Sequence, residues 1–230
     1  MRSGLAFLTC SKCALIVDPC SYSGPALCEL ADHALGVPGG QHLVRLSALR
    51  SAMIGRPMHR MLVITELFSD SEGLSDALVW LDWLVSHRAL GMKVVVYTGI
   101  TDPLLLRLVL DCCPSALVLR HEQLDVLEAA LHSSTTSYYH TWLSPGSSVV
   151  LEHLPAVSLT PREAEWLLTQ TDGLDLNSSA MRMRVSYKTA AALRYNIIHR
   201  LGDNAATFGR RLAAMREQTG AGLRGWQKTP

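Results

Sequence analysis

The sequence has few charges, few aromatic side chains and no long apolar run. Of its 230 residues, 18% are charged and 6% aromatic, while 48% are hydrophobic. This balance excludes an intrinsically disordered chain and provides enough apolar side chains for one large domain or two modest ones. The longest apolar stretches are broken by Asp82, Lys93 or Asp111. The sequence therefore predicts no membrane span.

Sequence motifs of catalysis and targeting are also missing. Neither a glycine-rich loop that would cradle phosphate nor a nucleophile–base pair is evident in the sequence. We therefore expect no enzyme activity and no cofactor. The apolar opening, Met1–Leu8, is too short for the hydrophobic segment of a signal peptide, and we expect a cytoplasmic protein.

Charge is unevenly distributed, although the formal net charge is only +1. Residues 1–157 hold 10 Lys and Arg against 14 Asp and Glu, a net of −4, whereas residues 158–230 hold 11 against 6, a net of +5. A basic module at one end of an acidic chain favours nucleic-acid contact confined to that end. A basic surface without a ligand would have the same composition.

Four of the six cysteines lie near the N-terminus, at Cys10, Cys13, Cys20 and Cys28. The first pair has the spacing of zinc and redox motifs. However, Cys13 and Cys28 fall at core positions of an expected strand and helix, and small buried thiols in a reducing compartment account for them. We expect neither a metal nor a disulfide.

Apolar runs alternate with helical segments over the first 132 residues. The predicted strands are 13–17, 42–46, 61–65, 93–97 and 116–119, and the predicted helices are 25–35, 75–84, 102–110 and 124–132. This alternation predicts an α/β domain with a five-stranded parallel sheet wrapped by helices. Asp18, Glu66, Thr98 and Arg120 stand at strand ends. Because carboxyl ends of parallel strands meet at one edge, we expect one pocket.

The segment 158–202 carries the start and stop signals of three helices, and a fourth helix follows it. Thr160 and Glu163 form a capping box, with Pro161 at the first helical position. For a second helix that ends near Met183, the candidate caps are Asn177, Ser178 and Ser179. Ser186 is the candidate cap of a third helix over 187–201, and Gly202 is its stop. Asp203 or Asn204 precedes the fourth helix. A short helix, tight turn and longer helix indicate a helix-turn-helix, although a small bundle with ordinary surface arginines has the same periodicity.

The third of these helices divides into two faces. Ala190, Leu193, Ile197 and Leu201 recur at helical spacing and should pack inward. The candidate DNA contacts on the other face and the preceding turn are Arg184, Ser186, Lys188, Thr189, Ala191, Ala192, Arg194, Tyr195, His199 and Arg200. We expect Lys188 to enter the major groove and the arginines to contact phosphates. Alanine cannot hydrogen-bond a base edge, so direct readout should be sparse.

This segment resembles the C-terminal DNA-binding domain of LuxR-type regulators. The resemblance is carried by Leu159-Thr160-Pro161-Arg162-Glu163, Gly173-Leu174, Lys188-Thr189, Asn196-Ile197 and Leu201-Gly202, without a gap from Gly173 to Gly202. It implies an all-α, four-helix DNA-binding domain whose last helix often joins two subunits. The chain departs from the family at 190–193, which read Ala-Ala-Ala-Leu, and at Arg184, where the family has glycine.

The first half resembles the flavodoxin-like receiver domain of bacterial response regulators. There an acidic pair holds Mg²⁺, an aspartate accepts a phosphoryl group, and a Ser/Thr and a lysine read it out. Here one acid of the pair remains, Asp18; Glu66 replaces the acceptor, Thr98 is retained and Arg120 replaces the lysine. Too few oxygen ligands remain for phosphoryl transfer, so the resemblance implies a pseudo-receiver. Either Glu66 pairs with Arg120 in an activated-like state, or the residues form a polar cap without switching.

Over nearly its full length the chain resembles response-regulator-like transcription factors of the RcsB/RcsA/BglJ group. We divide it into a pseudo-receiver domain at 10–132, a linker at 133–155, a helix-turn-helix domain at 156–217 and a disordered tail at 218–230. The resemblance implies a regulator that binds double-stranded promoter DNA independently of phosphorylation, as a homodimer or as a heterodimer with an RcsB-like regulator. An interaction protein that sequesters a regulator without binding DNA, or a phosphate-responsive receiver, stays open.

Overall fold

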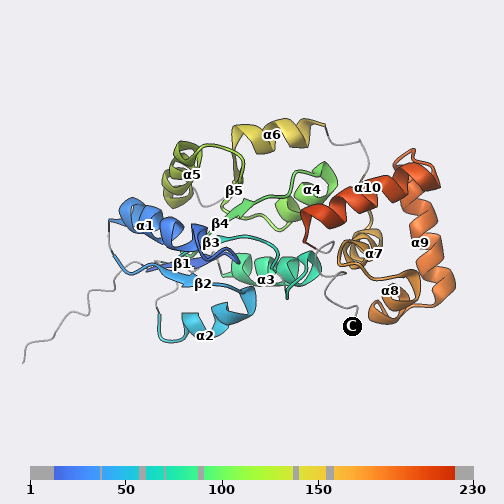
Figure 1. Cartoon of the computed structure of the whole chain (residues 1–230), viewed down its shortest axis with the longest axis horizontal. Helices are drawn as coiled ribbons and strands as arrows, with labels where there is room; N and C mark the ends of the chain where they lie inside the picture. The colour runs from blue at the N-terminus through green and yellow to red at the C-terminus, as the bar shows by residue number, and fades with distance from the viewer. Residues whose placement is uncertain are drawn as a thin grey trace, which may run out of the picture.

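The computed structural model describes residues 13–36, 38–56, 61–69, 71–87, 91–136, 140–153 and 158–220 (Figure 1). Cys10 and residues 221–230 of the predicted tail lie outside these ranges. The described chain forms an α/β half around a central sheet and a helical half at the other end of the molecule. Among its helices, none is both long and apolar enough to cross a membrane.

A parallel sheet forms the centre of the first half. From one edge to the other, its strands are β2 (Gln41–Leu43), β1 (Cys13–Val17), β3 (Met61–Thr65), β4 (Lys93–Thr98), β5 (Ala116–Leu119) and β6 (Trp142–Leu143). The strand order reverses between β1 and β3, and ligand crevices in open parallel sheets lie at the carboxyl ends of such strands. Val17 and Thr65 are register partners at this point. Asp18 and Glu66, the residues that directly follow them, therefore lie side by side.

The sheet has six strands, not the five that were predicted. The additional strand, β6, covers only two residues and pairs with β5. Two half-buried residues offer neither an apolar run nor an alternating pattern in the sequence. The second predicted strand is shorter than expected, because it ends at Leu43 and the 3-10 helix η1 (Leu46–Ala48) follows.

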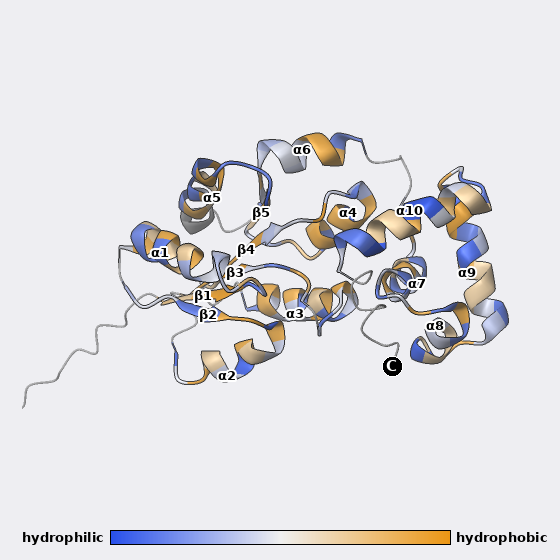
Figure 2. Cartoon of the chain, in the orientation of Figure 1, coloured by the Kyte–Doolittle hydropathy of each residue, from blue (hydrophilic) through white to orange (hydrophobic). Residues whose placement is uncertain are grey.

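Helices cover both faces of this sheet. They are α1 (Ser23–Leu35), α2 (Leu49–Met53), α3 (Leu74–Ser86), α4 (Pro103–Asp111), α5 (Leu124–Thr136) and α6 (Pro145–Glu152). Ile64 of β3 points into a core with α1 and α5, whereas its neighbour Val63 points into a core with α3 and α4. Successive strand residues face opposite sides, so strands covered on both faces are mostly apolar, with orange segments in Figure 2.

The segment predicted as a linker, 133–155, contains regular structure. It holds the end of α5, the strand β6 and the helix α6. Ser144 caps α6 by accepting the Ser147 N–H at 3.1 Å, and Pro145 occupies the first turn. The serine, proline and glycine content that indicated a linker is also the content of a capped helix start. Residues 140–153 therefore belong to the α/β half.

The second half consists of α7 (Pro161–Thr171), α8 (Leu176–Arg182), α9 (Tyr187–Arg200) and α10 (Ala205–Gln218). Its core includes Trp166 and Phe208, whose stacked rings lie 6.3 Å apart between centroids. The same cluster of buried apolar side chains continues into the α3–α4 side of the sheet. The two halves are therefore packed against each other.

Most helix ends of the second half follow the predicted caps. The capping box of Thr160 and Glu163 is present, Ser186 caps α9, and Gly202 follows α9 with φ +67°. The prediction for α8 was wrong: its cap is Asp175, which accepts the Ser178 N–H at 2.7 Å. Any of these polar side chains can cap a helix, and only the backbone path selects one.

The predicted tail begins too early. Gln218 is the last residue of α10, and Thr219 is buried. Its hydroxyl donates to the carbonyl oxygen of Thr171 at 3.2 Å. This contact joins residues 48 positions apart, and nothing local in the sequence indicates it.

Candidate functional site

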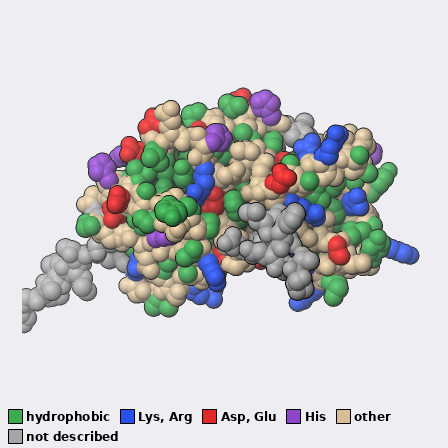
Figure 3. Space-filling view, in the orientation of Figure 1, with side chains coloured by type: hydrophobic (Ala, Val, Ile, Leu, Met, Phe, Trp, Pro, Cys, Tyr) green, Lys and Arg blue, Asp and Glu red, His purple; other side chains and the backbone are tan. Residues whose placement is uncertain are grey.

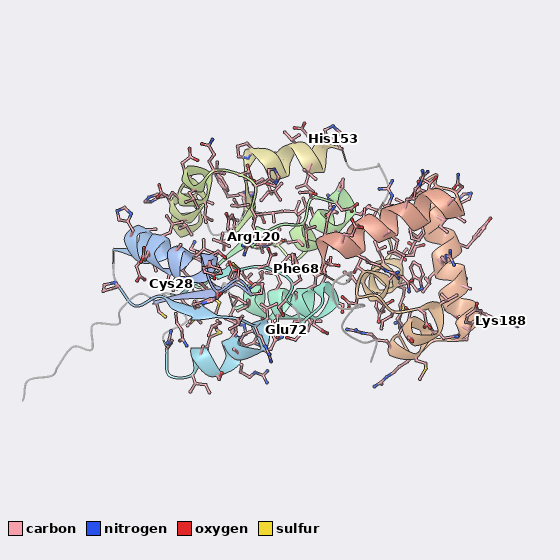
Figure 4. All side chains as sticks on the ribbon, in the orientation of Figure 1. Cys28, Phe68, Glu72, Arg120, His153 and Lys188 are labelled. Carbon is pink, nitrogen blue, oxygen red and sulfur yellow. The ribbon has the colours of Figure 1, made fainter. Side chains whose placement is uncertain are left out.

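The structure brings together the four polar residues that were predicted at the strand ends. Asp18, Glu66 and Thr98 are buried, and the guanidinium of Arg120, which is labelled in Figure 4, contacts both carboxylates. Its Nη2 is 2.6 Å from Asp18 Oδ2, and its Nε is 2.7 Å from Glu66 Oε2. The expected pair of Glu66 and Arg120 is therefore present, but it is not bidentate, because the guanidinium divides its donors between two acids.

Other protein groups occupy the remaining oxygens of both acids. Asp18 accepts the N–H of Cys20 at 2.8 Å and the hydroxyl of Ser23 at 2.7 Å. Glu66 accepts the N–H of Leu67 at 2.8 Å and the N–H of Gly99 at 3.1 Å. In the part of the chain that the structure describes, no group of three or more His, Cys, Asp or Glu could hold a metal ion. The pocket is satisfied by its own donors.

Burial and charge act in opposite directions on this cluster. Burial raises the pKa of Glu66, whereas Arg120, the Thr98 hydroxyl and two backbone N–H groups favour its ionised form. The two acids raise the pKa of Arg120 against the effect of its burial. The guanidinium also lies over the ring of Tyr97, 5.0 Å from the centroid. Arg120 is a fixed internal counter-ion at the centre of the pocket.

The predicted DNA contacts share one outward surface of α9 and the turn before it. Apart from half-buried Ala191, all are exposed: Arg184, Ser186, Lys188, Thr189, Ala192, Arg194, Tyr195, His199 and Arg200. On the opposite side, Ala190 and Ile197 are fully buried. α9 lies at the end of the molecule remote from the sheet, with Lys188 at its outer edge (Figure 4). This division agrees with the predicted faces.

The cations on this surface, here called the α9 surface, differ in availability. Arg184, Lys188 and Arg194 make no ion pair with any residue that the structure describes. Arg200 donates from Nε to Glu163 Oε1 at 3.2 Å and so ties the end of α9 to the start of α7. Figure 3 shows Lys and Arg side chains distributed over this end of the molecule. Three cations are therefore available to an external anion.

The turn between α8 and α9 is tight and unusual. Arg184 has φ +54°, a left-handed conformation that side chains other than glycine rarely adopt. The turn is closed by two backbone bonds, from the Arg184 N–H to Met181 at 3.1 Å and from the Val185 N–H to Ala180 at 3.0 Å. Such bonding ends a helix that is followed by a sharp change of direction. It sets α9 at an angle to α8 with Arg184 exposed.

Sequence reasoning missed the polar contacts that join the two halves. Asp172 accepts the hydroxyl of Ser75, and Arg182 lies 3.0 Å from Asp76. Gln218 accepts backbone N–H groups of the loop before α4 at 2.9 Å. These residues are about a hundred positions apart in sequence, and no spacing or motif in the sequence relates them.

Comparison with solved structures shows the fold. No model of a known protein family and no curated protein matches the sequence. RcsB from Salmonella enterica serovar Typhimurium, bound to a promoter with the phosphomimetic BeF3⁻, is similar with a TM-score of 0.61 at 21% identity, over 89% of this chain and 99% of that one. A structure of two RcsB dimers bound to two parallel DNAs gives 0.58 at 19% identity, over 92% and 98%. The chain therefore has the two-part fold of these proteins, a parallel α/β half followed by a helical half.

Proposed function

We propose that this protein is a response-regulator-like transcriptional regulator that binds double-stranded promoter DNA through α9. The observation that carries the proposal is the α9 surface, where Arg184, Lys188 and Arg194 stand exposed and make no ion pair with a described residue. Phosphates bind such cations, and the helix after a tight turn is the element that enters a major groove. The DNA-bound state of the RcsB neighbours supports this assignment.

The helical half is a helix-turn-helix domain of the LuxR type in this proposal. α8 and α9 form the motif, and α7 and α10 support it through the core around Trp166 and Phe208. Ser186 fixes the start of α9 by accepting the Thr189 N–H at 3.1 Å. Lys188, two residues after Ser186, then projects from the first turn of α9. The first turn is the part of a recognition helix that reaches base edges.

The α/β half is a pseudo-receiver that works without phosphorylation. Arg120 already pairs with Asp18, the remaining acid of the metal-binding pair, and with Glu66, which stands in the place of the acceptor. An acceptor for phosphoryl transfer must be reached by a metal-bound phosphodonor, but Glu66 is buried and fully bonded to protein donors. The cluster therefore supports one constant state.

Dimerisation completes the proposal. A single α9 surface with two alanines at its centre gives little direct base readout, and two copies double the contacts. Two RcsB dimers are seen on DNA in one neighbouring structure. This chain acts as a homodimer, or as the auxiliary subunit of a heterodimer with an RcsB-like regulator.

The test is selection of binding sites from a random pool of DNA duplexes, followed by gel shifts of the selected duplex at several salt concentrations. Lys188→Ala should weaken binding and reduce the slope of log K against log salt by about one. Arg107→Ala, which removes an exposed arginine of α4, is the matched control and should bind normally. Unchanged binding by Lys188→Ala would show that α9 does not lie in the groove.

Sequestration of another regulator is the second candidate function. It is favoured by exposed large side chains beside the alanines, since Met181, Tyr187 and Tyr195 are 80%, 55% and 68% exposed. The gel shift separates the two functions when it is repeated with an RcsB-like regulator present. Binding only with the partner identifies an auxiliary subunit. If the wild type selects no duplex and lowers the partner's DNA affinity, it is a sequestering protein.

A further inference from the structure

The loop between β4 and α4 joins the sheet-edge pocket to α10, the last helix that the structure describes. At its start, the Gly99 N–H donates to Glu66 Oε2 at 3.1 Å. At its end, the side-chain oxygen Oε1 of Gln218 accepts the N–H groups of Thr101 and Asp102, both at 2.9 Å. This loop is therefore bonded to the pocket on one side and to α10 on the other.

The same loop has little freedom between these two attachments. The side chain of Ile100 is fully buried, and its N–H donates to Thr98 Oγ1 at 3.2 Å. Asp102 caps α4 by accepting the N–H of Leu104 at 2.9 Å. Buried and hydrogen-bonded backbone has little room to move, so the two attachments restrain the same short loop.

A second contact lies beside the first and follows β3. Phe68 is two residues beyond Glu66, and a Cβ added at Gly220 would lie 3.5 Å from its ring. The segments that follow β3 and β4 therefore lie next to Gly220 and Gln218, just beyond α10 and at its end. Figure 4 shows Phe68 between the sheet and this helix.

A third contact fixes α7 and α8 against α3. Arg182 donates to the Ser75 hydroxyl at 2.7 Å and to Asp76 at 3.0 Å, while the Ser75 hydroxyl donates to Asp172. A side chain at Gly73 would overlap the carboxylate of Asp172. Three separate contacts join the helical half to the α/β half, and α9 lies at the end of the molecule remote from the sheet (Figure 1).

We infer that the Asp18–Arg120–Glu66 cluster holds the helical half in its docked orientation, acting through the β4–α4 loop and Gln218. This inference rests on the proposed function for its purpose, since the docked orientation presents the α9 surface to DNA. Because Arg120 belongs to the protein itself, the docked orientation requires no external ligand at the sheet edge. The contact of Arg120 with Glu66 Oε2 holds that side chain in place as the acceptor for the Gly99 N–H, and the loop keeps its hold on α10.

The test is hydrogen exchange of the full chain, measured by mass spectrometry on peptides from α10 and from the β4–α4 loop. Gln218→Ala leaves two backbone N–H groups unpaired and should speed exchange at the end of α10 about tenfold. Arg120→Lys keeps the charge but cannot reach both acids, and it should produce a similar increase at the same peptides. Gln123→Ala, an exposed glutamine before α5, is the control and should change neither.

A double-mutant cycle of Gln218→Ala and Arg120→Lys tests the inference, because the effects of coupled residues are not additive. If the cluster acts through Gln218, Arg120→Lys adds nothing to exchange at α10 in the Gln218→Ala background. Additive effects would overturn the inference, as would exchange that rises near β3 and β4 but not at α10. If Arg120→Lys unfolds the chain, Glu66→Gln, which preserves shape, takes its place in the cycle.

Exchange requires no DNA, so this result is independent of the proposed function. A coupled cycle together with no DNA binding would preserve the inference about docking and remove the proposed function. DNA binding together with an additive cycle would do the reverse. When both hold, Gln218→Ala should also weaken binding to the selected duplex, by about threefold to tenfold.

Discussion

Replacing Arg120 with methionine tests the account of the pocket directly. The guanidinium is the cation that contacts both Asp18 and Glu66, at 2.6 Å and 2.7 Å. The side chains of the acids are 0% and 2% exposed, whereas that of Arg120 is 26% exposed. Methionine has similar bulk and flexibility but no charge. The change therefore leaves two buried acids without their counter-ion.

Removing one partner of a buried ion pair costs about 3–5 kcal/mol. Because water can reach the partly exposed position of Arg120, we expect the lower end of this range, about 3 kcal/mol. That is a large fraction of the roughly 5–15 kcal/mol by which folded proteins exceed their unfolded states. Arg107→Met, which removes an exposed ion pair with Asp111, should cost under about 0.5 kcal/mol and serves as the control.

The loss of stability in Arg120→Met should depend on pH, and the pKa of Glu66 sets the direction of this dependence. Burial already raises the pKa of Glu66, and removing Arg120 raises it further because an opposing charge is gone. A carboxyl group with a raised folded-state pKa contributes stability that is fully present below its unfolded pKa and is lost as pH rises through the folded pKa. The variant should therefore lose less stability, relative to wild type, at about pH 5 than at about pH 7.5.

Urea unfolding followed by circular dichroism at both pH values measures these differences. Adding Glu66→Gln to Arg120→Met should recover part of the loss at the higher pH, because it removes one of the buried charges. A loss below about 1 kcal/mol, or an equal loss at both pH values, would refute the view that Arg120 is the counter-ion of these two acids.

Two further predictions concern the turn before α9 and the contact between the halves. Arg184→Gly should raise the free energy of unfolding, measured with urea, by up to about 1 kcal/mol, since φ +54° suits glycine. The same change should weaken DNA binding and its salt dependence, measured by gel shift. Weaker folding with unchanged DNA binding would contradict both parts. Gly73→Ala should push Asp172 away and speed proteolysis between the halves, whereas Gly209→Ala, with open space around it, should not; equal proteolysis of the two variants would contradict the contact.

Local signals in the sequence predicted most of the elements. Continuous apolar runs marked the four longer strands, because strands covered on both faces are mostly apolar, with polar side chains confined to their ends. The capping box at Thr160 and the stop at Gly202 marked helix ends, because these depend on neighbouring residues only. Signals failed where local chemistry was ambiguous: Asp175, not Asn177, caps α8, and Ser144-Pro145 starts a helix within a predicted linker.

The sequence alone determined which residues stand at the strand ends and which face of α9 is polar. Strand position puts Asp18 and Glu66 at one edge of any such parallel sheet, and the helical period separates Lys188 from Ile197. Tertiary structure decided what these residues contact. The path of the chain brings Arg120 between two acids instead of beside one, because guanidinium donors bond every acceptor within reach. Docking of distant segments through contacts such as that of Gln218 with the β4–α4 loop depends on the packed core and has no local sequence signal.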